Sequence, residues 1–263
     1  MTHDARRLAG RTAFITGGSS GIGRSIAECF AQAGAGVVVT ARDEAQLRET
    51  TRRCSEHGVP AHELVADLGA SDFDAQELTA QATALAPEID VFVSNAGAYF
   101  DVPFLEMTAD RFDRTWRLNV RAGYLLAVEF ARRWHAAGVL GRMIFVGSIN
   151  GKLSEPVSTA YDISKAAIDG MVRTLCVELA PLGIRVNGLA PGLIHTAATS
   201  WLETNRERAE WVASHTPSRE IPQAKVCGDA AVFLASDEAD HVHGHVLSVD
   251  GGLAAIQYPD PPR

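Results

Sequence analysis

Short apolar runs and segments with helical periodicity alternate from the beginning of the chain. Residues 12–16 form an apolar run that stops at Gly17 and Gly18, and a helical pattern follows it. The apolar positions of that pattern are Ile22, Ile26, Ala27, Phe30 and Ala31. The β-branched run at 37–40 is typical of a parallel strand that is buried on both faces. This order predicts a complete strand–helix–strand unit by residue 41.

The same alternation continues toward the C-terminus. Further strands are predicted near 62–66, 90–94, 142–147, 184–189 and 245–249. Further helices are predicted near 44–57, 71–86, 109–137, 159–181 and 224–236, and Asp43 is placed to cap the first of them. Such a series predicts an α/β Rossmann fold, with a doubly wound, mostly parallel, seven-stranded sheet and helices on both faces. Right-handed crossovers then bring the carboxyl ends of the strands to one edge, where a ligand can bind.

We expect a single domain over residues 1–263, because α/β folds of this size commonly form one unit. The less regular stretch 193–223 carries Trp201 and Trp211, and it favours a mobile helical lid over the site. A surface excursion without a role is the alternative for this stretch. The short tail 253–263 is too short to form a module.

Composition narrows the possible partners. The chain is 46% hydrophobic and 21% charged, the balance of a globular enzyme, and its net charge is -8. This charge opposes binding to nucleic acid or to an anionic membrane, because both need a clustered basic surface. The opening residues contain no apolar segment, and no later run is long enough to cross a bilayer. We therefore expect a cytoplasmic protein without nucleic-acid or membrane partners.

No metal site is predicted. The four cysteines are widely scattered and form no C-x-x-C pair, which favours reduced structural thiols; they are Cys29, Cys54, Cys176 and Cys227. Three histidines alternate at the approach to the last predicted strand, and without supporting carboxylate or thiolate ligands they indicate ordinary strand residues; they are His241, His243 and His245.

The glycine-rich turn after the first strand is suited to a dinucleotide. Gly17 permits the tight turn, Gly21 lets the backbone approach a pyrophosphate, and Gly23 allows the helix to pack closely. The N-terminus of the following helix then faces the phosphates. Glycines also occur in turns that bind nothing, but this spacing between a strand and a helix favours a cofactor site.

The end of the second strand bears on the choice of cofactor. Many dinucleotide folds place an acid there for the ribose of NAD, whereas an arginine accommodates the 2′-phosphate of NADP. Here Ala41 takes the acid position and Arg42 follows it, while Ser19 and Ser20 could donate hydrogen bonds to the same phosphate. This pattern favours NADP over NAD. In the alternative interpretation Asp43 is the relevant acid and the cofactor is NAD.

Three polar residues suggest proton transfer beside this cofactor. Tyr161 and Lys165 lie one helical turn apart, so both side chains emerge on one face. A nearby ammonium favours the phenolate and is expected to lower the pKa of Tyr161 from about 10. Ser148 follows a predicted strand, so its hydroxyl could hydrogen-bond a substrate oxygen as charge develops there.

Together these motifs resemble the short-chain dehydrogenase/reductase family. The resemblance spans residues 11 to 252 and rests on Thr16 to Gly23, Ser94-Asn95-Ala96-Gly97, Ser148, Tyr161-Asp162-Ile163-Ser164-Lys165 and Pro191-Gly192. Two departures are small, because neither Ser94 nor His243 is part of the proton-transfer group.

The resemblance implies further roles. Lys165 would also bind the nicotinamide ribose, and Asn119 would hold a water that links Lys165 to solvent, although Asn119 could equally be a buried amide that packs helices. Other implied cofactor contacts are Ile22, Asp67, Leu68, Asn95, Ala96, Gly97, Pro191, Gly192, Ile194 and Thr196. His195 is interpreted as a lid residue and Asp250 as structural.

The resulting prediction is an NAD(P)-dependent oxidoreductase that transfers a hydride between nicotinamide and a ketone or secondary alcohol, with Tyr161 as general acid/base. One alternative is a 3-oxoacyl-thioester reductase, in which Arg132 and Arg133 could meet an acidic carrier protein. Another is a noncatalytic NADP-binding sensor. The resemblance and the apolar residues of the helices at 109–137 and 159–181 also favour a homodimer or homotetramer.

The substrate itself is left open. Residues expected to line its pocket are Tyr99, Phe100, Asn150, Leu153, Glu155, Leu193 and Trp201. The aromatic and apolar members suit a ring ketone or acyl chain, whereas the amide and carboxylate could hold sugar hydroxyls.

Overall fold

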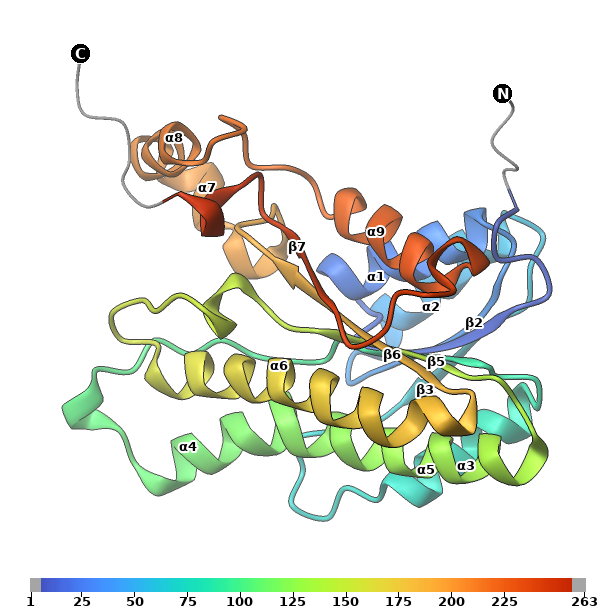
Figure 1. Ribbon diagram of the computed structural model, residues 1–263. Coiled ribbons are helices and arrows are strands. Elements are labelled where there is room, and N and C mark those ends of the chain that lie inside the picture. Colours follow the sequence, from blue (N-terminus) through green and yellow to red (C-terminus); the bar gives the residue numbers. More distant parts are fainter. Residues whose placement is uncertain (1–5, 257–263) are drawn as a thin grey trace.

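The computed structural model describes residues 6–256, and the strands of this part form one parallel sheet. The strands are β1 (Thr12–Thr16), β2 (Gly36–Ala41), β3 (Ala61–Val65), β4 (Val91–Ser94), β5 (Arg142–Val146), β6 (Arg185–Pro191) and β7 (Val246–Val249). Within the described residues the seven strands follow the order β3-β2-β1-β4-β5-β6-β7 (Figure 1). The predicted Rossmann fold is therefore confirmed, and the strand order reverses between β1 and β4, where such sheets open a crevice.

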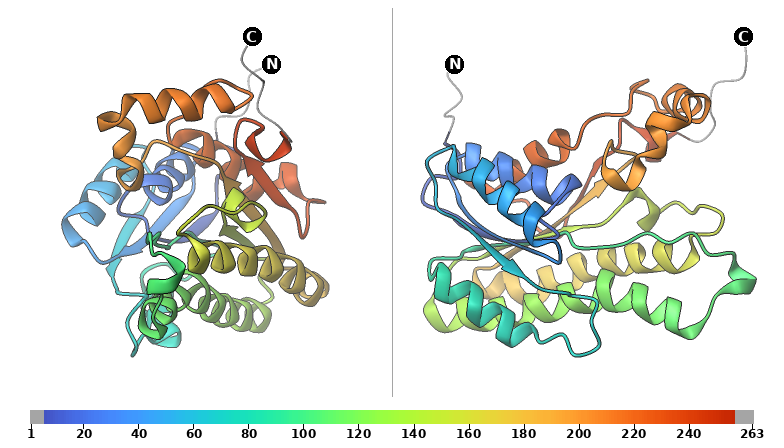
Figure 2. Two further views of the ribbon diagram at one scale, coloured as in Figure 1. Left: turned by 90° about the vertical axis from the view of Figure 1, so that its left-hand side faces the viewer. Right: turned by 180° about the vertical axis from the view of Figure 1, so that it is seen from behind.

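Helices cover both faces of the sheet, as Figures 1 and 2 show. One face carries α1 (Gly21–Gln32), α2 (Glu44–Ser55) and α9 (Lys225–Ala235), and the other carries α3 (Ala75–Leu85), α5 (Ala122–Ala137) and α6 (Thr159–Leu179). The helix predicted over 109–137 is interrupted. It consists of α4 (Ala109–Trp116), a π-helical turn (Arg117–Arg121) and α5.

The core consists of two layers because side chains of a strand alternate between the faces of the sheet. In β1, Ala13 and Ile15 belong to the layer under α1 and α9, whereas Phe14 belongs to the opposite layer. There Phe92 and Phe130 pack against Phe14, and the rings of Phe92 and Phe130 stack on each other with their centroids 5.1 Å apart. Burial on both faces explains why inner strands such as β1, β2 and β4 read as continuous apolar runs.

The segment predicted as a lid is helical. It contains α7 (Trp201–Thr204) and α8 (Arg206–His215), which lie over the carboxyl end of the sheet at the upper left of Figure 1. A short 3-10 turn at Leu253–Ala255 follows β7, and the rest of the predicted tail, 257–263, lies outside the described residues. Among the described residues, no helix combines the length and apolar character needed to cross a bilayer.

Candidate active site

The turn between β1 and α1 is built as a cradle for a phosphate group. Gly17 and Gly21 have φ of 67° and 54°, in the left-handed region that favours glycine. A Cβ on Gly23 would lie 2.2 Å from the Gly17 carbonyl oxygen, so a side chain there would push α1 away from the turn. The turn thus presents bare backbone and a helix N-terminus to the crevice, which fits the pyrophosphate of a dinucleotide.

The end of β4 is fastened to this turn by hydrogen bonds. The Thr16 hydroxyl accepts from the backbone N–H groups of Asn95 and Ala96 at 2.9 and 3.0 Å. The Asn95 side-chain amide in turn donates to the Thr16 carbonyl at 3.0 Å. Asn95 and Ala96 therefore line the point at which the strand order reverses, next to the glycine-rich turn.

Positive charge gathers where the adenosine end of a dinucleotide would lie. Arg42 is exposed directly after β2, and the Asp43 carboxylate caps α2 by accepting from the Gln46 N–H at 3.0 Å. The guanidinium of Arg24 donates to the Ser19 carbonyl and, at 3.1 Å, to the Thr50 hydroxyl. The sequence analysis missed Arg24, although its signal was simple: a basic residue directly after the third glycine.

The two residues expected at the adenine are placed differently. Asp67 is exposed and accepts from the Gly69 N–H at 2.9 Å, which shapes the turn after β3. The Leu68 side chain packs into the core layer that contains Phe14. An adenine contact from Leu68 would therefore have to use its backbone.

The residues after β6 lie at the same mouth. Pro191 ends the strand, and Gly192 packs against Asp250, since a Cβ on this glycine would lie 2.9 Å from Asp250 Cα. The Thr196 side chain lies 3.4 Å from the position of a Cβ on Gly21, so it lies against the glycine-rich turn. Ile194, between them, is buried in the core.

The two ends of the lid segment are joined. The His195 N–H donates to the Pro222 carbonyl at 3.0 Å, and His195 pairs with Gln223 as an isolated bridge. The backbone of His195 therefore closes the base of the segment, and its interpretation as a lid residue stays a prediction. Asp250 is structural, as predicted, because its carboxylate accepts from the backbone N–H groups of Gly252 and Ala254.

Ser148, Tyr161 and Lys165 meet between β5 and α6. The Lys165 ammonium lies 5.5 Å from the centroid of the Tyr161 ring and donates to the Val146 carbonyl at 3.0 Å. The Tyr161 phenol lies within hydrogen-bonding reach of Ser148. A Cβ on Gly97 would lie 3.6 Å from Lys165 Nζ, so the lysine also reaches the segment that follows β4.

The electrostatics of this group correct one expectation. Burial raises the pKa of Tyr161, and this effect outweighs the lowering by its hydrogen bond with Ser148. Burial also lowers the pKa of Lys165 from 10.5 to about 8, although the Asp169 carboxylate raises it. The expected lowering of the Tyr161 pKa by Lys165 was wrong for this structure, because removal from water disfavours both charged forms.

Asn119 lies in the π-helical turn and is buried. Its amide oxygen accepts from the Ala98 N–H at 2.8 Å, and its amide nitrogen donates to the Ala98 carbonyl and the Ser164 hydroxyl, both at 3.0 Å. Its side chain thus joins the segment after β4 to α6. These side-chain hydrogen bonds do not test the predicted water that links Asn119 to Lys165, and that link stays a prediction.

The residues expected to line the substrate pocket lie in several different places. Tyr99 lies at the site, with its ring 4.9 Å from that of Tyr161. Phe100 instead lines a cavity of about 320 Å³ against α4, where the Arg114 guanidinium lies 5.0 Å from its ring. Trp201 lies in α7 and packs against Arg208 of α8, whose guanidinium lies 4.2 Å from the indole. The others lie on the β5–α6 connection or directly after β6; they are Asn150, Leu153, Glu155 and Leu193.

Comparisons with known proteins agree with this geometry. The family profile described as Enoyl-(Acyl carrier protein) reductase matches residues 17–254. Glucose 1-dehydrogenase of Gluconobacter oxydans is 32% identical over 94% of this chain and 93% of its own length. The chain belongs to the short-chain dehydrogenase/reductase family. It is therefore an NAD(P)-dependent oxidoreductase of CH–OH and C=O groups, as predicted.

Solved structures of this short-chain dehydrogenase/reductase family superpose over nearly the whole chain. A protein from Beutenbergia cavernae, described as an NAD(P)-dependent gluconate 5-dehydrogenase with bound NADP, is 37% identical, with a TM-score of 0.88. The match covers 95% of this chain and 98% of that one. A gluconate 5-dehydrogenase from Burkholderia cenocepacia, in complex with NADP and tartrate, is 32% identical, with a TM-score of 0.89 and coverage of 96% and 98%.

Proposed function

We propose that this protein is an NADP(H)-dependent dehydrogenase or reductase of a polyhydroxylated sugar or sugar acid. One observation carries the proposal. The side chains of Ser148, Tyr161 and Lys165 converge beside the crevice where the strand order reverses, next to a glycine turn that accepts a pyrophosphate. This arrangement combines a site for a dinucleotide with an acid/base group, which a noncatalytic sensor would not need.

Each residue has a distinct role in the proposed mechanism. The nicotinamide, when bound, accepts or supplies the hydride. Tyr161 transfers a proton to or from the substrate oxygen, and the Ser148 hydroxyl stabilises that oxygen as its charge changes. Lys165 holds the nicotinamide ribose and supplies positive charge beside the phenol. Asn119 fixes the π-helical turn, where its backbone could hold the water that connects Lys165 to solvent.

Three observations support NADP over NAD. Arg42 and Arg24 both lie at the adenosine end, and the acid at this strand end, Asp43, is engaged in capping α2. An arginine beside the 2′-phosphate forms charge-assisted hydrogen bonds that NAD cannot match. The two gluconate 5-dehydrogenase structures contain NADP.

Replacing Arg42 with alanine tests this preference. We expect the dissociation constant of NADPH to rise about tenfold and that of NADH to change little, because one charge-assisted contact contributes about 1.5 kcal/mol. Energy transfer from the tryptophans to the reduced nicotinamide measures both constants. The matched control is Arg48→Ala, since Arg48 is exposed on α2, the helix that follows Arg42, and pairs with Glu44. Equal affinity of the unmodified protein for NADH and NADPH would contradict the preference.

The sugar class is supported by the relatives and by the polar groups near the mouth. Glu155 is exposed on the connection between β5 and α6, beside the Tyr161 site. A carboxylate there can accept hydrogen bonds from sugar hydroxyls. With NADP⁺ we expect oxidation of D-gluconate or D-glucose to exceed the reduction of acetoacetyl-coenzyme A with NADPH in kcat/KM. The reverse order would favour the 3-oxoacyl-thioester reductase.

The carrier-protein contact considered for that alternative is not supported. Arg132 forms an ion pair with Glu129 of its own helix, at 2.6 Å. It also lies about 20 Å along the helix from Asn119, at 1.5 Å per residue, toward the opposite edge of the sheet. A carrier docked there would be far from Tyr161.

Three broader properties belong to the proposal. Residues 193–223 would close over bound substrate as a lid, within one domain over 1–263. A homodimer or homotetramer would cover apolar residues on α6 such as Ile163 and Val177, which are 52% and 78% exposed. A monomeric mass in sedimentation would contradict this assembly.

A cytoplasmic location would suit the free cysteines. Fractionation of cells tests this location.

A further inference from the structure

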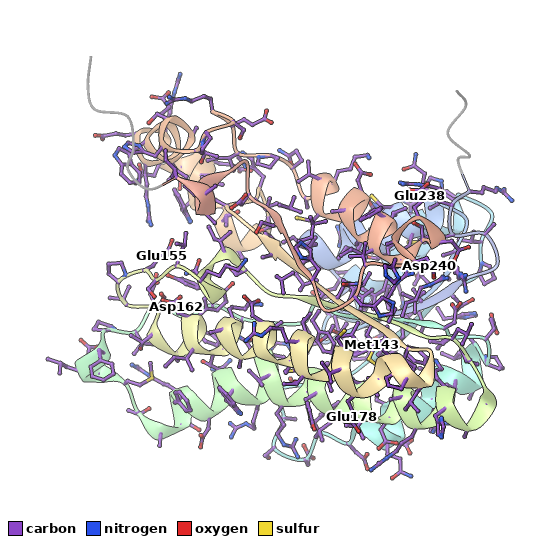
Figure 3. All side chains as sticks on the ribbon, viewed as in Figure 1. Met143, Glu155, Asp162, Glu178, Glu238 and Asp240 are labelled. Atoms are coloured by element: carbon purple, nitrogen blue, oxygen red, sulfur yellow. The ribbon has the colours of Figure 1, made fainter. Side chains whose placement is uncertain are left out.

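Two carboxylates lie at the mouth of the site, near the start of α6. Asp162 directly follows Tyr161 in the sequence and is 8% exposed. Its carboxylate accepts from the Asn150 side-chain amide at 2.8 Å and from the Glu155 N–H at 3.1 Å. Both partners are donors, as an ionised carboxylate requires. The Glu155 side chain is exposed, and Figure 3 shows Glu155 and Asp162 near each other at this end of α6, with Glu178 at the other end.

The connection that carries Glu155 is held in place at this mouth. The Glu155 N–H is bound by Asp162, and the Glu155 carbonyl accepts from the Ser158 hydroxyl at 2.9 Å. The Val157 carbonyl accepts from the Val102 N–H at 2.8 Å, which ties the connection to the segment after β4. Val157 does so with φ of 62°, which is unfavourable for a β-branched residue and persists only where the surroundings impose it. The Glu155 side chain therefore projects from a fixed backbone.

Both carboxylates act on the two phenols at the site. Burial raises the pKa of Tyr161 most, and the charges of Glu155 and Asp162 raise this pKa further. The same two charges add to the pKa of Tyr99, after the larger effects of burial and of the hydrogen bond with Asp101. The rings of Tyr161 and Tyr99 are 4.9 Å apart. A substrate oxygen at Tyr161 would therefore lie in the field of two negative charges.

Other charged side chains near this mouth occur together with opposite charges. Two arginines and two carboxylates line the cavity against α4, and a lysine on the β5–α6 connection lies near a buried carboxylate. In this order they are Arg111, Arg114, Asp101 and Glu106, and then Lys152 and Asp169. The segment 193–223 carries three arginines and four glutamates, so it adds no net positive charge. Lys165 lies beside Tyr161, where the carboxylates of Glu155 and Asp162 outnumber it.

We infer that the mouth selects a neutral sugar or sugar alcohol over a sugar acid. The inference rests on the proposed function, which leaves this choice open. Hydroxyl groups can donate hydrogen bonds to the exposed Glu155 carboxylate, whereas a substrate carboxylate only accepts and is repelled by it. Asp162 has both oxygens bound by N–H groups of the protein, so it contributes charge and Glu155 makes the contact.

The test compares D-gluconate with D-gluconamide, which share their carbon chain and hydroxyls and differ mainly in charge at C1. With NADP⁺ at low ionic strength, we expect kcat/KM of the unmodified protein to be about tenfold higher for gluconamide. Each carboxylate would contribute about threefold at a separation on the order of 10 Å. Salt at about 0.5 M should narrow this ratio, because it screens exposed charges.

Changing the charge at position 155 tests the residue itself. Glu155→Gln keeps a hydrogen-bond acceptor and removes the charge, and Glu155→Lys reverses the charge. We expect kcat/KM for gluconate relative to gluconamide to rise about threefold in the first variant and about tenfold in the second. The matched controls are Glu178→Gln and Glu178→Lys, at an exposed position near the far end of α6, and they should leave the ratio unchanged.

The ratio compares two substrates of the same variant, so a change in folding or in NADP⁺ affinity affects both substrates alike. A ratio that ignores the charge at position 155 would overturn the inference while leaving the proposed function intact. A preference of the unmodified protein for gluconate over gluconamide would do the same. If the protein oxidises neither of these compounds nor D-glucose with NADP⁺, the sugar class of the proposed function fails, and the inference fails with it.

Discussion

Replacing Tyr161 with phenylalanine is expected to lower kcat about 10³-fold while NADPH still binds, because it removes the proton donor and leaves the ring in place. The aromatic contact with Tyr99 and the fit against Lys165 depend on the ring, so the fold should be retained. The measurement is the rate of NADPH oxidation with the substrate preferred by the unmodified protein, together with NADPH affinity from fluorescence.

The chain offers a matched control in Tyr124→Phe, an identical change at an exposed position of α5. This control should keep the turnover of the unmodified protein. Unchanged turnover in Tyr161→Phe would show that another group supplies the proton. A neighbouring phenol is that of Tyr99, whose pKa is raised by burial and by its hydrogen bond with Asp101.

The fold could be predicted from local pattern because strands of a parallel sheet are buried on both faces. A continuous β-branched run such as 37–40 fits few structures other than a buried strand. Each predicted strand matches an observed strand within two residues at either end. The glycine turn was predictable for a similar reason. The positive φ of Gly17 and Gly21 and the contact at Gly23 leave little choice of residue type.

Other features depend on contacts between distant segments. The π-helical turn at Arg117–Arg121 lies inside a helical pattern that carries no local break, and the hydrogen bonds from Asn119 to Ala98 and Ser164 accompany it. Phe100 lines a cavity against α4, where the Arg114 guanidinium lies over its ring. The periodicity of a single segment does not show which distant residues its side chains will contact.

The pKa expectation for Tyr161 failed for a related physical reason. Sequence spacing places Lys165 on the same helical face but does not report how much water surrounds the pair. In the structure, burial opposes the charged form of each residue. Asp162 and Asn150 were also out of reach of local reasoning, since their hydrogen bond spans a loop. The convergence of Ser148, Tyr161 and Lys165 could thus be predicted from the sequence, but the effect of burial on their pKa values could not.

Replacing Lys165 with methionine is expected to abolish most turnover and to change how stability depends on pH. The folded protein without cofactor holds this lysine with a pKa of about 8, below the ordinary value of 10.5. Between these two pKa values the unfolded chain binds a proton that the folded chain lacks. The free energy of unfolding therefore rises with pH over this range. The gain is complete above 10.5 and is lost as pH falls through 8.

The stability of the unmodified protein relative to Lys165→Met should therefore increase by about 3 kcal/mol between pH 7.5 and 10.5, from a pKa difference of about 2.5. Denaturant unfolding of both proteins without cofactor measures this difference, and other groups, including the buried cysteines, contribute equally to both. In Lys165→Met the Asp169 carboxylate loses one neighbouring cation, but Lys152 and Arg173 remain beside it. Parallel pH curves would contradict burial of an ammonium at this site. If the stability difference between the two proteins rises with pH, the charged form of Lys165 destabilises the folded protein. The fold would then tolerate an unfavourable buried ammonium at the position where the reaction requires it.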